Sequence, residues 1–213
     1  MPDLATFALF LAAAVVLAIT PGPGLFYVAA RTLAGGRGEG LASSLGTGLG
    51  GSVHVLAGAL GVSAVVMASA ELFAALKLVG AAYLVWIGVR TIVDARRAAA
   101  IPGAAVARVG IHRAFREGVL VEALNPKTAA FFLAFIPQFV SPAAGPVALQ
   151  FVVLGLVSVA LNTLADIAVA FAAGRLRDGA AARPGLVRRL RTASGAAMVA
   201  LGLGLAVARR PAG

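Results

Sequence analysis

Long apolar runs, each interrupted by few polar positions, dominate the chain. Several of them reach or exceed the ~18 residues typical of a helix that crosses a bilayer, and all are far longer than the ~10-residue alternating segments of a membrane barrel. The pattern predicts an all-α membrane protein with six transmembrane helices, at Leu4–Ala30, Leu45–Ala68, Leu72–Val93, Gly118–Val140, Val147–Ala173 and Thr192–Val207.

Helix-breaking residues interrupt the first and fourth runs near their middles. Thr20-Pro21-Gly22-Pro23-Gly24 lies in the first run and Asn125-Pro126-Lys127 in the fourth. Each proline lacks an N–H, so the carbonyl four residues earlier loses its usual helical partner. In lipid, such irregular backbone persists only where it is buried in protein or lines a wet cavity. We therefore expect broken first and fourth helices, with simple kinks in well-packed helices as the alternative.

The two breaks occupy matching positions in two halves of the chain. When Leu17–Pro21 is aligned with Glu122–Pro126, a polar residue and a proline coincide. Because each half would hold three spans, the second half would lie inverted relative to the first, as in secondary transporters whose sites form where broken helices meet. This predicts one domain, residues 1–213, with two inverted three-helix repeats at about 1–93 and 117–213 and a flexible linker at about 94–116. Chance matching of prolines is the alternative.

Composition and charge support a membrane protein and predict its orientation. Hydrophobic residues make up 61% of the chain and charged residues 12%. Most of the 18 lysines and arginines lie in or beside alternate connections: Arg31 and Arg37; Arg90, Arg96, Arg97, Arg108, Arg113 and Arg116; Arg175, Arg177, Arg183, Arg188, Arg189 and Arg191. The positive-inside rule places these segments in the cytoplasm, and both termini and the turns near Ala70 and 141–145 outside. Arg209 and Arg210 argue weakly for the opposite orientation.

The net charge of +10 does not by itself predict a nucleic-acid partner. The basic residues lie in short loops at helix ends without interleaved aromatics, so we expect attraction to anionic lipid heads and no nucleic acid. The N-terminus lacks a basic region, and two prolines follow its apolar run, which favours a retained first helix over a cleaved signal. The chain has no cysteine, so no thiolate metal site is expected, and no pattern indicates a metal or other cofactor.

The breaks are the candidate binding site. A broken helix exposes amide N–H groups at one new end and carbonyls at the other, which suit a carboxylate and an ammonium group respectively. A zwitterionic amino acid carries both groups. The candidate substrate-binding residues are Thr20, Pro21, Gly22, Pro23, Gly24, Asn125, Pro126 and Lys127, with Tyr83 as a further hydroxyl.

Charged residues inside the spans require partners. Lys127 lies roughly 13 Å into its span at 1.5 Å per residue, too deep for its ammonium to reach water easily. Its candidate partners are Asp166, Glu122 or a substrate carboxylate, and a purely structural salt bridge stays open. Asp166, the acid of the fifth span, is the candidate for a coupling proton, with Asn162 one turn away on the same face. Glu122 is expected near the interface, where water could solvate it.

Two further features of the second span bear on the site. His54 has either a proton role or a hydrogen-bonded packing role. Glycines recur at positions that predict a small-residue face for close backbone packing: Gly46, Gly48, Gly50, Gly51, Gly58 and Gly61.

Taken together, the motifs resemble those of the LysE/RhtB family of bacterial amino acid exporters. The matching segments are Thr20–Pro23, the stretch from Gly35 to Gly51, Lys77–Leu84, Phe115–Gly118, Leu124–Lys127 with Phe131-Phe132, and Phe135–Phe139. The resemblance implies a multi-pass inner-membrane exporter of amino acids or their derivatives, driven by the proton motive force. The family often has Asn or Asp after Pro-Gly-Pro, whereas this chain has Gly24, which leaves the choice of substrate open.

Other functions were weighed against export of amino acids. An exporter of another small solute or of a cation is the nearest alternative, although two histidines and no cysteine disfavour soft-metal transport. An intramembrane enzyme is less favoured: Ser52 and His54 lack a surrounding nucleophile motif, and one membrane aspartate does not make an aspartyl protease. We therefore expect a transporter and not an enzyme, acting on a small molecule within the lipid bilayer, with a homo-oligomer left open.

Overall fold

The computed structural model describes residues 3–68, 70–97, 108–177 and 184–207, and every regular element within these ranges is helical. The class of the fold therefore agrees with the predicted all-α class. In chain order the elements are α1 (Leu4–Ile19), α2 (Pro23–Gly35), α3 (Arg37–Ala68), α4 (Ala70–Arg97), α5 (Ile111–Ala123), α6 (Pro126–Ala130), η1 (Phe131–Phe135), η2 (Ile136–Phe139), η3 (Pro142–Ala144), α7 (Val147–Arg177) and α8 (Pro184–Val207).

The first helix breaks where the sequence predicts. Thr20 and Gly22, between α1 and α2, adopt extended backbone angles (φ −74°, ψ 111° and φ −131°, ψ −173°), and the two helix axes bend by 44°. Pro23 starts α2, a position where no N–H is needed and where the ring's fixed φ suits a helix. α2 continues past the predicted end at Ala30 and stops where Gly36 adopts φ +88°, a conformation that favours glycine.

The fourth helix also breaks at the predicted motif. α5 ends at Ala123, and the side chain of Asn125 caps the start of α6 by accepting a hydrogen bond from the N–H of Lys127 at 3.0 Å. Pro126 is the first residue of α6, and the axes bend by 41°. Beyond α6 the chain winds as a π-helix, η1, and then as a 3-10 turn, η2.

Several predicted boundaries were wrong in the same direction, because polar turns extend the helices beyond their apolar runs. α3 starts at Arg37 and not Leu45, α5 at Ile111 and not Gly118, and α8 at Pro184 and not Thr192. The predicted linker at 94–116 is therefore too long at both ends, and residues 98–107 of it lie outside the described residues. Arginine is a good helix former whose long side chain reaches water from a helix end, so a search for apolar runs stops too early.

A test of length and apolar composition identifies α7, over Val147–Arg175, as able to cross a membrane, within the part of the chain that the structure describes. Each bent pair, α1 with α2 and the α5 to η2 segment, also passes when it is counted as one span. The described helices thus supply one span, or up to three, and the number six stays a prediction.

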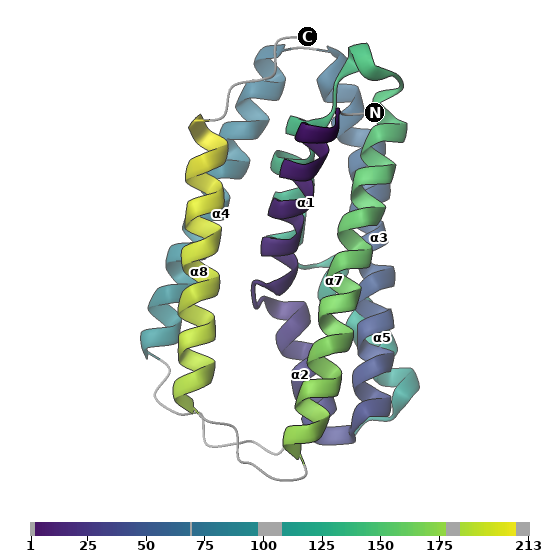
Figure 1. Cartoon of the computed structure of the whole chain (residues 1–213), viewed down its shortest axis with the longest axis vertical. Helices are drawn as coiled ribbons and strands as arrows, with labels where there is room; N and C mark the ends of the chain where they lie inside the picture. Colours follow the sequence, from purple (N-terminus) through teal and green to yellow (C-terminus); the bar gives the residue numbers. More distant parts are fainter. Residues whose placement is uncertain (1–2, 69, 98–107, 178–183, 208–213) are drawn as a thin grey trace.

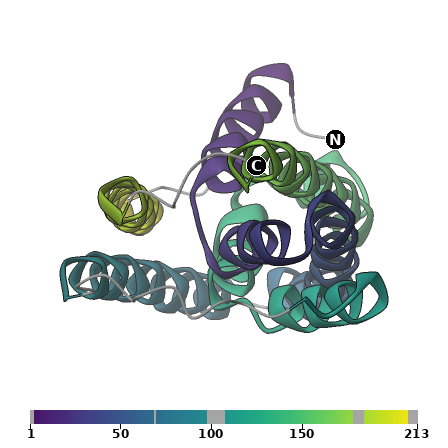
Figure 2. The ribbon, with the colours of Figure 1, turned by 90° about the horizontal axis from the view of Figure 1, so that it is seen from below.

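The long helices run side by side (Figure 1). The start of α1 and the end of α8 lie at one end of the molecule, and the α2–α3 connection and the end of α7 lie at the other. We call the latter the arginine-rich end, because Arg31 is near the end of α2, Arg37 starts α3 and Arg175 is near the end of α7. α8 packs against α4 to one side of the other helices (Figure 2), while α3 packs against both α5 and α7. A two-fold relation between the halves stays a prediction.

Glycines bring α3 close to its neighbours, as predicted. A Cβ at Gly46 would collide with the carbonyl oxygen of Phe115 on α5, and one at Gly50 with that of Val119. Toward α7, a Cβ at Gly58 would enter the ring of Phe151. Gly61 departs from the prediction, because a Cβ there would meet nothing within 4 Å. The close approach of α3 to α5 places the second break beside the middle of α3.

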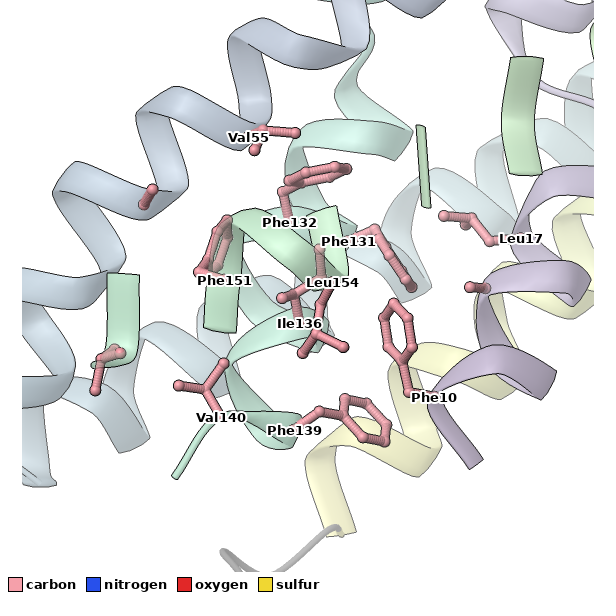
Figure 3. Close-up of a cluster of buried hydrophobic side chains, with 13 residues drawn as sticks. Phe10, Leu17, Val55, Phe131, Phe132, Ile136, Phe139, Val140, Phe151 and Leu154 are labelled. Atoms are coloured by element: carbon pink, nitrogen blue, oxygen red, sulfur yellow. The ribbon is translucent and has the colours of Figure 1, made fainter. Parts of the chain in front are cut away.

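A cluster of buried aromatic side chains fills the space between the breaks and the end where α1 begins. Phe131, Phe132 and Phe139, from η1 and η2, pack with Phe10 of α1 and Phe151 of α7 (Figure 3). The rings of Phe10 and Phe139 meet edge to face with centroids 5.5 Å apart. We call these five residues the aromatic cluster.

Candidate functional site

Lys127 joins the two helix breaks. Its ammonium group, on a side chain only 4% exposed, donates hydrogen bonds to the carbonyl oxygens of Leu17 (3.2 Å) and Thr20 (2.9 Å). The Leu17 carbonyl is one that the missing N–H of Pro21 leaves without its helical partner. The partner of Lys127 in this structure is therefore the carbonyl end of α1, where the helix dipole places negative charge, whereas the sequence suggested a carboxylate.

Glu122 lies buried within the second break. It is 7% exposed, so the predicted solvation at the interface is wrong. Its two carboxylate oxygens accept one hydrogen bond each, from Asn125 Nδ2 (2.9 Å) and Thr128 Oγ1 (2.6 Å). Asn125 thus uses its oxygen to cap α6 and its amide hydrogens to hold Glu122, which orders the break around this carboxylate.

His54 supplies a second donor to the Glu122 carbonyl, which loses its helical donor at Pro126 and also accepts from the N–H of Asn125 at 3.0 Å. Its Nε2 lies 2.9 Å from the carbonyl oxygen of Glu122, so Nε2 carries the hydrogen of this bond. The ring also packs near Phe132, with centroids 5.8 Å apart. Of the two roles that the sequence left open, this contact favours hydrogen-bonded packing.

Asp166 faces the breaks from α7. It is 6% exposed, and its Oδ2 lies 2.7 Å from the hydroxyl oxygen of Thr47 on α3. That hydroxyl is also 2.9 Å from the carbonyl oxygen of Ser44. A hydroxyl has one hydrogen, so both contacts become full hydrogen bonds when Asp166 is protonated and donates to Thr47 while Thr47 donates to Ser44.

These groups surround one pocket at the junction of the breaks. The pocket encloses a cavity of about 20 Å³, room for about one water molecule. Its lining consists of Ala18, Gly24, Leu25, Thr47, Gly48, Gly51, Glu122, Asn125, Lys127, Thr128, Phe132, Val159, Asn162, Thr163 and Asp166.

The structure brings six of the thirteen predicted site residues together at the pocket. Gly24, Glu122, Asn125, Lys127, Asn162 and Asp166 line the pocket. The other residues of the breaks, namely Thr20, Pro21, Gly22, Pro23 and Pro126, shape the chain next to it and are not among its lining. Tyr83 is not among the lining residues: its side chain on α4 is 38% exposed and stacks on Trp86 with ring centroids 5.7 Å apart.

Sequence reasoning missed several lining residues. Thr47, Thr128 and Thr163 contribute hydroxyls, and Ala18, Leu25, Phe132 and Val159 contribute apolar surface. Thr128 directly follows Lys127 in the sequence, so its position next to the break could have identified it as a lining residue. The contributions from α3 and α7 depend on which faces of these helices meet, which no local motif records.

Polar contacts tie α2 and α3 to α5 between the pocket and the arginine-rich end. The Tyr27 hydroxyl lies 3.0 Å from the carbonyl oxygen of Ala114 and 3.1 Å from Glu117 Oε2. Buried Glu39 accepts hydrogen bonds from the N–H groups of Val109 (3.0 Å) and Gly110 (2.9 Å), just before α5 begins. We call these contacts the polar latch. They lie on one side of the pocket, and the aromatic cluster lies on the other.

Comparison with known proteins places this arrangement in a family. The family described as LysE type translocator matches residues 15–209. An uncharacterized membrane protein of Pseudomonas aeruginosa is 34% identical over 91% of each chain. A homoserine/homoserine lactone efflux protein of Salmonella typhimurium is 28% identical over 94% of this chain and 95% of its own. A leucine efflux protein of Klebsiella pneumoniae is 27% identical over 69% of each chain.

No solved structure matches the chain significantly. The family match covers most of the sequence, including both helix breaks, and the Pseudomonas relative is similar over nearly its whole length. The chain therefore belongs to the LysE type translocator family.

Proposed function

We propose that this protein is a secondary-active exporter of amino acids or their derivatives in the bacterial inner membrane, coupled to protons. Family membership and the two relatives named as efflux proteins, for homoserine or its lactone and for leucine, support export. The observation that carries the proposal is the meeting of two broken helices at Lys127, beside two buried carboxylates that line the same pocket.

The charges of the pocket suit a zwitterion. An ammonium group has three hydrogens, and Lys127 directs two of them to carbonyls, which leaves one for a substrate carboxylate. Glu122 and Asp166 offer carboxylate oxygens to a substrate ammonium. With both acids ionised, the three groups carry one net negative charge in a buried space, so binding of either a proton or an amine is favoured.

The two acids differ in their hydrogen-bond partners, and this difference assigns their roles. Glu122 accepts from two donors, which fits an ionised carboxylate. Asp166 faces a hydroxyl that has another acceptor to satisfy, which fits a protonated acid. In our proposal Asp166 carries the coupling proton, and Glu122 stays ionised beside Lys127.

Export from peptide-loaded cells tests the function. Cells with and without the protein are loaded with dipeptides, and the appearance of the released amino acids in the medium is followed. We expect faster release with the protein, and slower release when an uncoupler collapses the proton gradient. Equal release with and without the protein, for every amino acid tried, would refute the proposal.

Export of another small solute or a cation is the second candidate, and the net negative charge that the pocket carries when both acids are ionised favours a cationic substrate. The same cells loaded with a small organic amine would report such transport. An enzymatic role gains no support from the contacts of Ser52 and His54: the hydroxyl of Ser52 lies 3.4 Å from the Gly48 carbonyl oxygen, while His54 bonds the Glu122 carbonyl. We therefore propose a transporter and not an enzyme.

A further inference from the structure

The pocket changes from polar to apolar along the axis of the helices. At one level, Gly48 of α3 faces Thr163 of α7: a Cβ on Gly48 would lie 2.7 Å from the Thr163 hydroxyl oxygen. Thr47 and Asp166 meet beside them. One turn further along α3, Gly51 faces Val159. A helical turn rises about 5.4 Å, so the polarity changes over roughly the distance from an amino acid's charged groups to its side chain.

The apolar level has one fixed wall. Phe132 is 2% exposed, and Gly155 packs so closely on it that a Cβ there would lie 3.1 Å from the ring. The Phe132 ring also lies beside Phe151, with centroids 6.2 Å apart (Figure 3). Gly51 and Val159 line the same pocket as Phe132. Because Phe132 has no room to recede, the space there depends on Gly51 and Val159.

Gly51 and Val159 leave little spare volume between them. A Cβ added to Gly51 would lie 3.0 Å from Val159 Cγ2, closer than ordinary van der Waals contact. Both residues line the cavity of about 20 Å³. Adding or removing one methyl group at Gly51 or Val159 would therefore change the volume of this cavity by a large fraction.

We propose that Gly51 and Val159 determine which substrate side chains the exporter accepts, and that they select amino acids with small apolar side chains. This inference rests on the proposed function, in which the charged groups of the substrate bind at Lys127, Glu122 and Asp166. The side chain then extends to the apolar level between Phe132 and the Gly51–Val159 pair. One methylene in an apolar pocket changes discrimination about 10-fold to 200-fold, which gives the pair enough leverage.

Export of a graded series tests the proposal. Cells are loaded with dipeptides of alanine, valine, leucine and phenylalanine, and relative export rates are compared among the wild type, Gly51→Ala, Val159→Ala and the double variant. We expect Gly51→Ala to lower export of the larger members relative to alanine by about tenfold, and Val159→Ala to raise it. The double variant should return toward the wild-type ratios, because it adds one methyl group at residue 51 and removes two at residue 159.

Gly61→Ala is the matched control, since it makes the same change on α3 where a Cβ meets nothing within 4 Å; its ratios should equal those of the wild type. Val159→Ala only removes atoms and introduces no clash. It therefore still tests the inference if the Gly51→Ala protein fails to insert into the membrane. Unchanged ratios in Val159→Ala, at equal amounts of inserted protein, would overturn this inference and leave the proposed function intact. Absence of amino acid export by the wild type would overturn both.

Discussion

At the scale of single residues, each proline removes one helical donor from a carbonyl, and a distant side chain supplies a further donor beside the backbone N–H that still reaches that carbonyl. Lys127 binds the Leu17 carbonyl that Pro21 frees, and His54 binds the Glu122 carbonyl that Pro126 frees. Each of these carbonyls also accepts from a backbone N–H, that of Thr20 or that of Asn125. A further hydrogen bond contributes about 0.5–1.5 kcal/mol net, so these contacts help to keep the breaks in place. The same contacts position Lys127 and Glu122 at the pocket. A substitution that breaks them should therefore affect both the stability of the breaks and the binding site.

Lys127→Ala should abolish transport and lower stability by about 1–3 kcal/mol, because the Thr20 carbonyl loses the donor that this structure gives it. Export at equal membrane content and thermal unfolding in detergent measure the two effects. Arg175→Ala removes an exposed positive charge at the arginine-rich end and serves as the charge-matched control. Wild-type export by Lys127→Ala would contradict the role of this residue.

Asp166→Asn should leave the protein folded and remove proton-driven export, with exchange of substrate retained. The asparagine amide can donate to the Thr47 hydroxyl as a protonated acid would, but it cannot release a proton. Export rates measured across external pH should lose their pH dependence. A variant that exports at the wild-type rate with an unchanged pH profile would make Asp166 structural.

At the scale of elements, α3 positions the site through its glycines. It approaches α5 so closely that Gly46 and Gly50 meet the backbone of α5, and it brings Thr47, Gly48 and Gly51 to the pocket from another face. Small residues on one helix let two backbones approach, which is a common means of helix association in membranes. These contacts therefore hold α5, and with it the second break, against α3.

Gly50→Ala should destabilise the protein, because the new Cβ would collide with the Val119 carbonyl oxygen and push α5 away from α3. Overpacking of this kind costs about 1–3 kcal/mol. Gly61→Ala on the same helix should be neutral or slightly stabilising. Thermal unfolding of both variants in detergent makes the comparison, and equal melting temperatures would show that the contact tolerates a side chain.

At the scale of the whole molecule, packed groups lie on both sides of the pocket along the helix axes. The polar latch lies between the pocket and the arginine-rich end, and the aromatic cluster lies on the opposite side of the pocket. A cavity of about 20 Å³ has no room for an amino acid, so transport requires each side to open in turn. Opening toward the arginine-rich end would break the hydrogen bonds of the polar latch. Opening toward the opposite end would separate the rings of the aromatic cluster.

The charges of the molecule predict its orientation in the membrane, and this prediction can be tested directly. The arginine-rich end should face the cytoplasm, with both termini outside. A reporter that is active only in the cytoplasm should work when it is inserted within residues 98–107 and fail when it is inserted within 141–145. The reverse result would place the arginine-rich end outside and refute this orientation.

The sequence by itself determined the helical class and the two breaks, because both depend on local chemistry. Apolar runs favour helices in lipid, and a proline removes its own N–H wherever it occurs. Lys127, Asn125 and Asp166 were identified for the same reason, since a polar residue inside an apolar run stands out in the sequence.

Only the tertiary structure decided which partners these residues have. The carbonyls of α1 bind Lys127, the side chains of Asn125 and Thr128 hold Glu122, and Tyr83 is not among the lining residues of the pocket. Helix ends also differed from prediction, because charged residues that do not belong to apolar runs still continue a helix. The partners of the site residues depend on which faces of α3 and α7 lie toward the breaks, and packing between distant segments determines those faces.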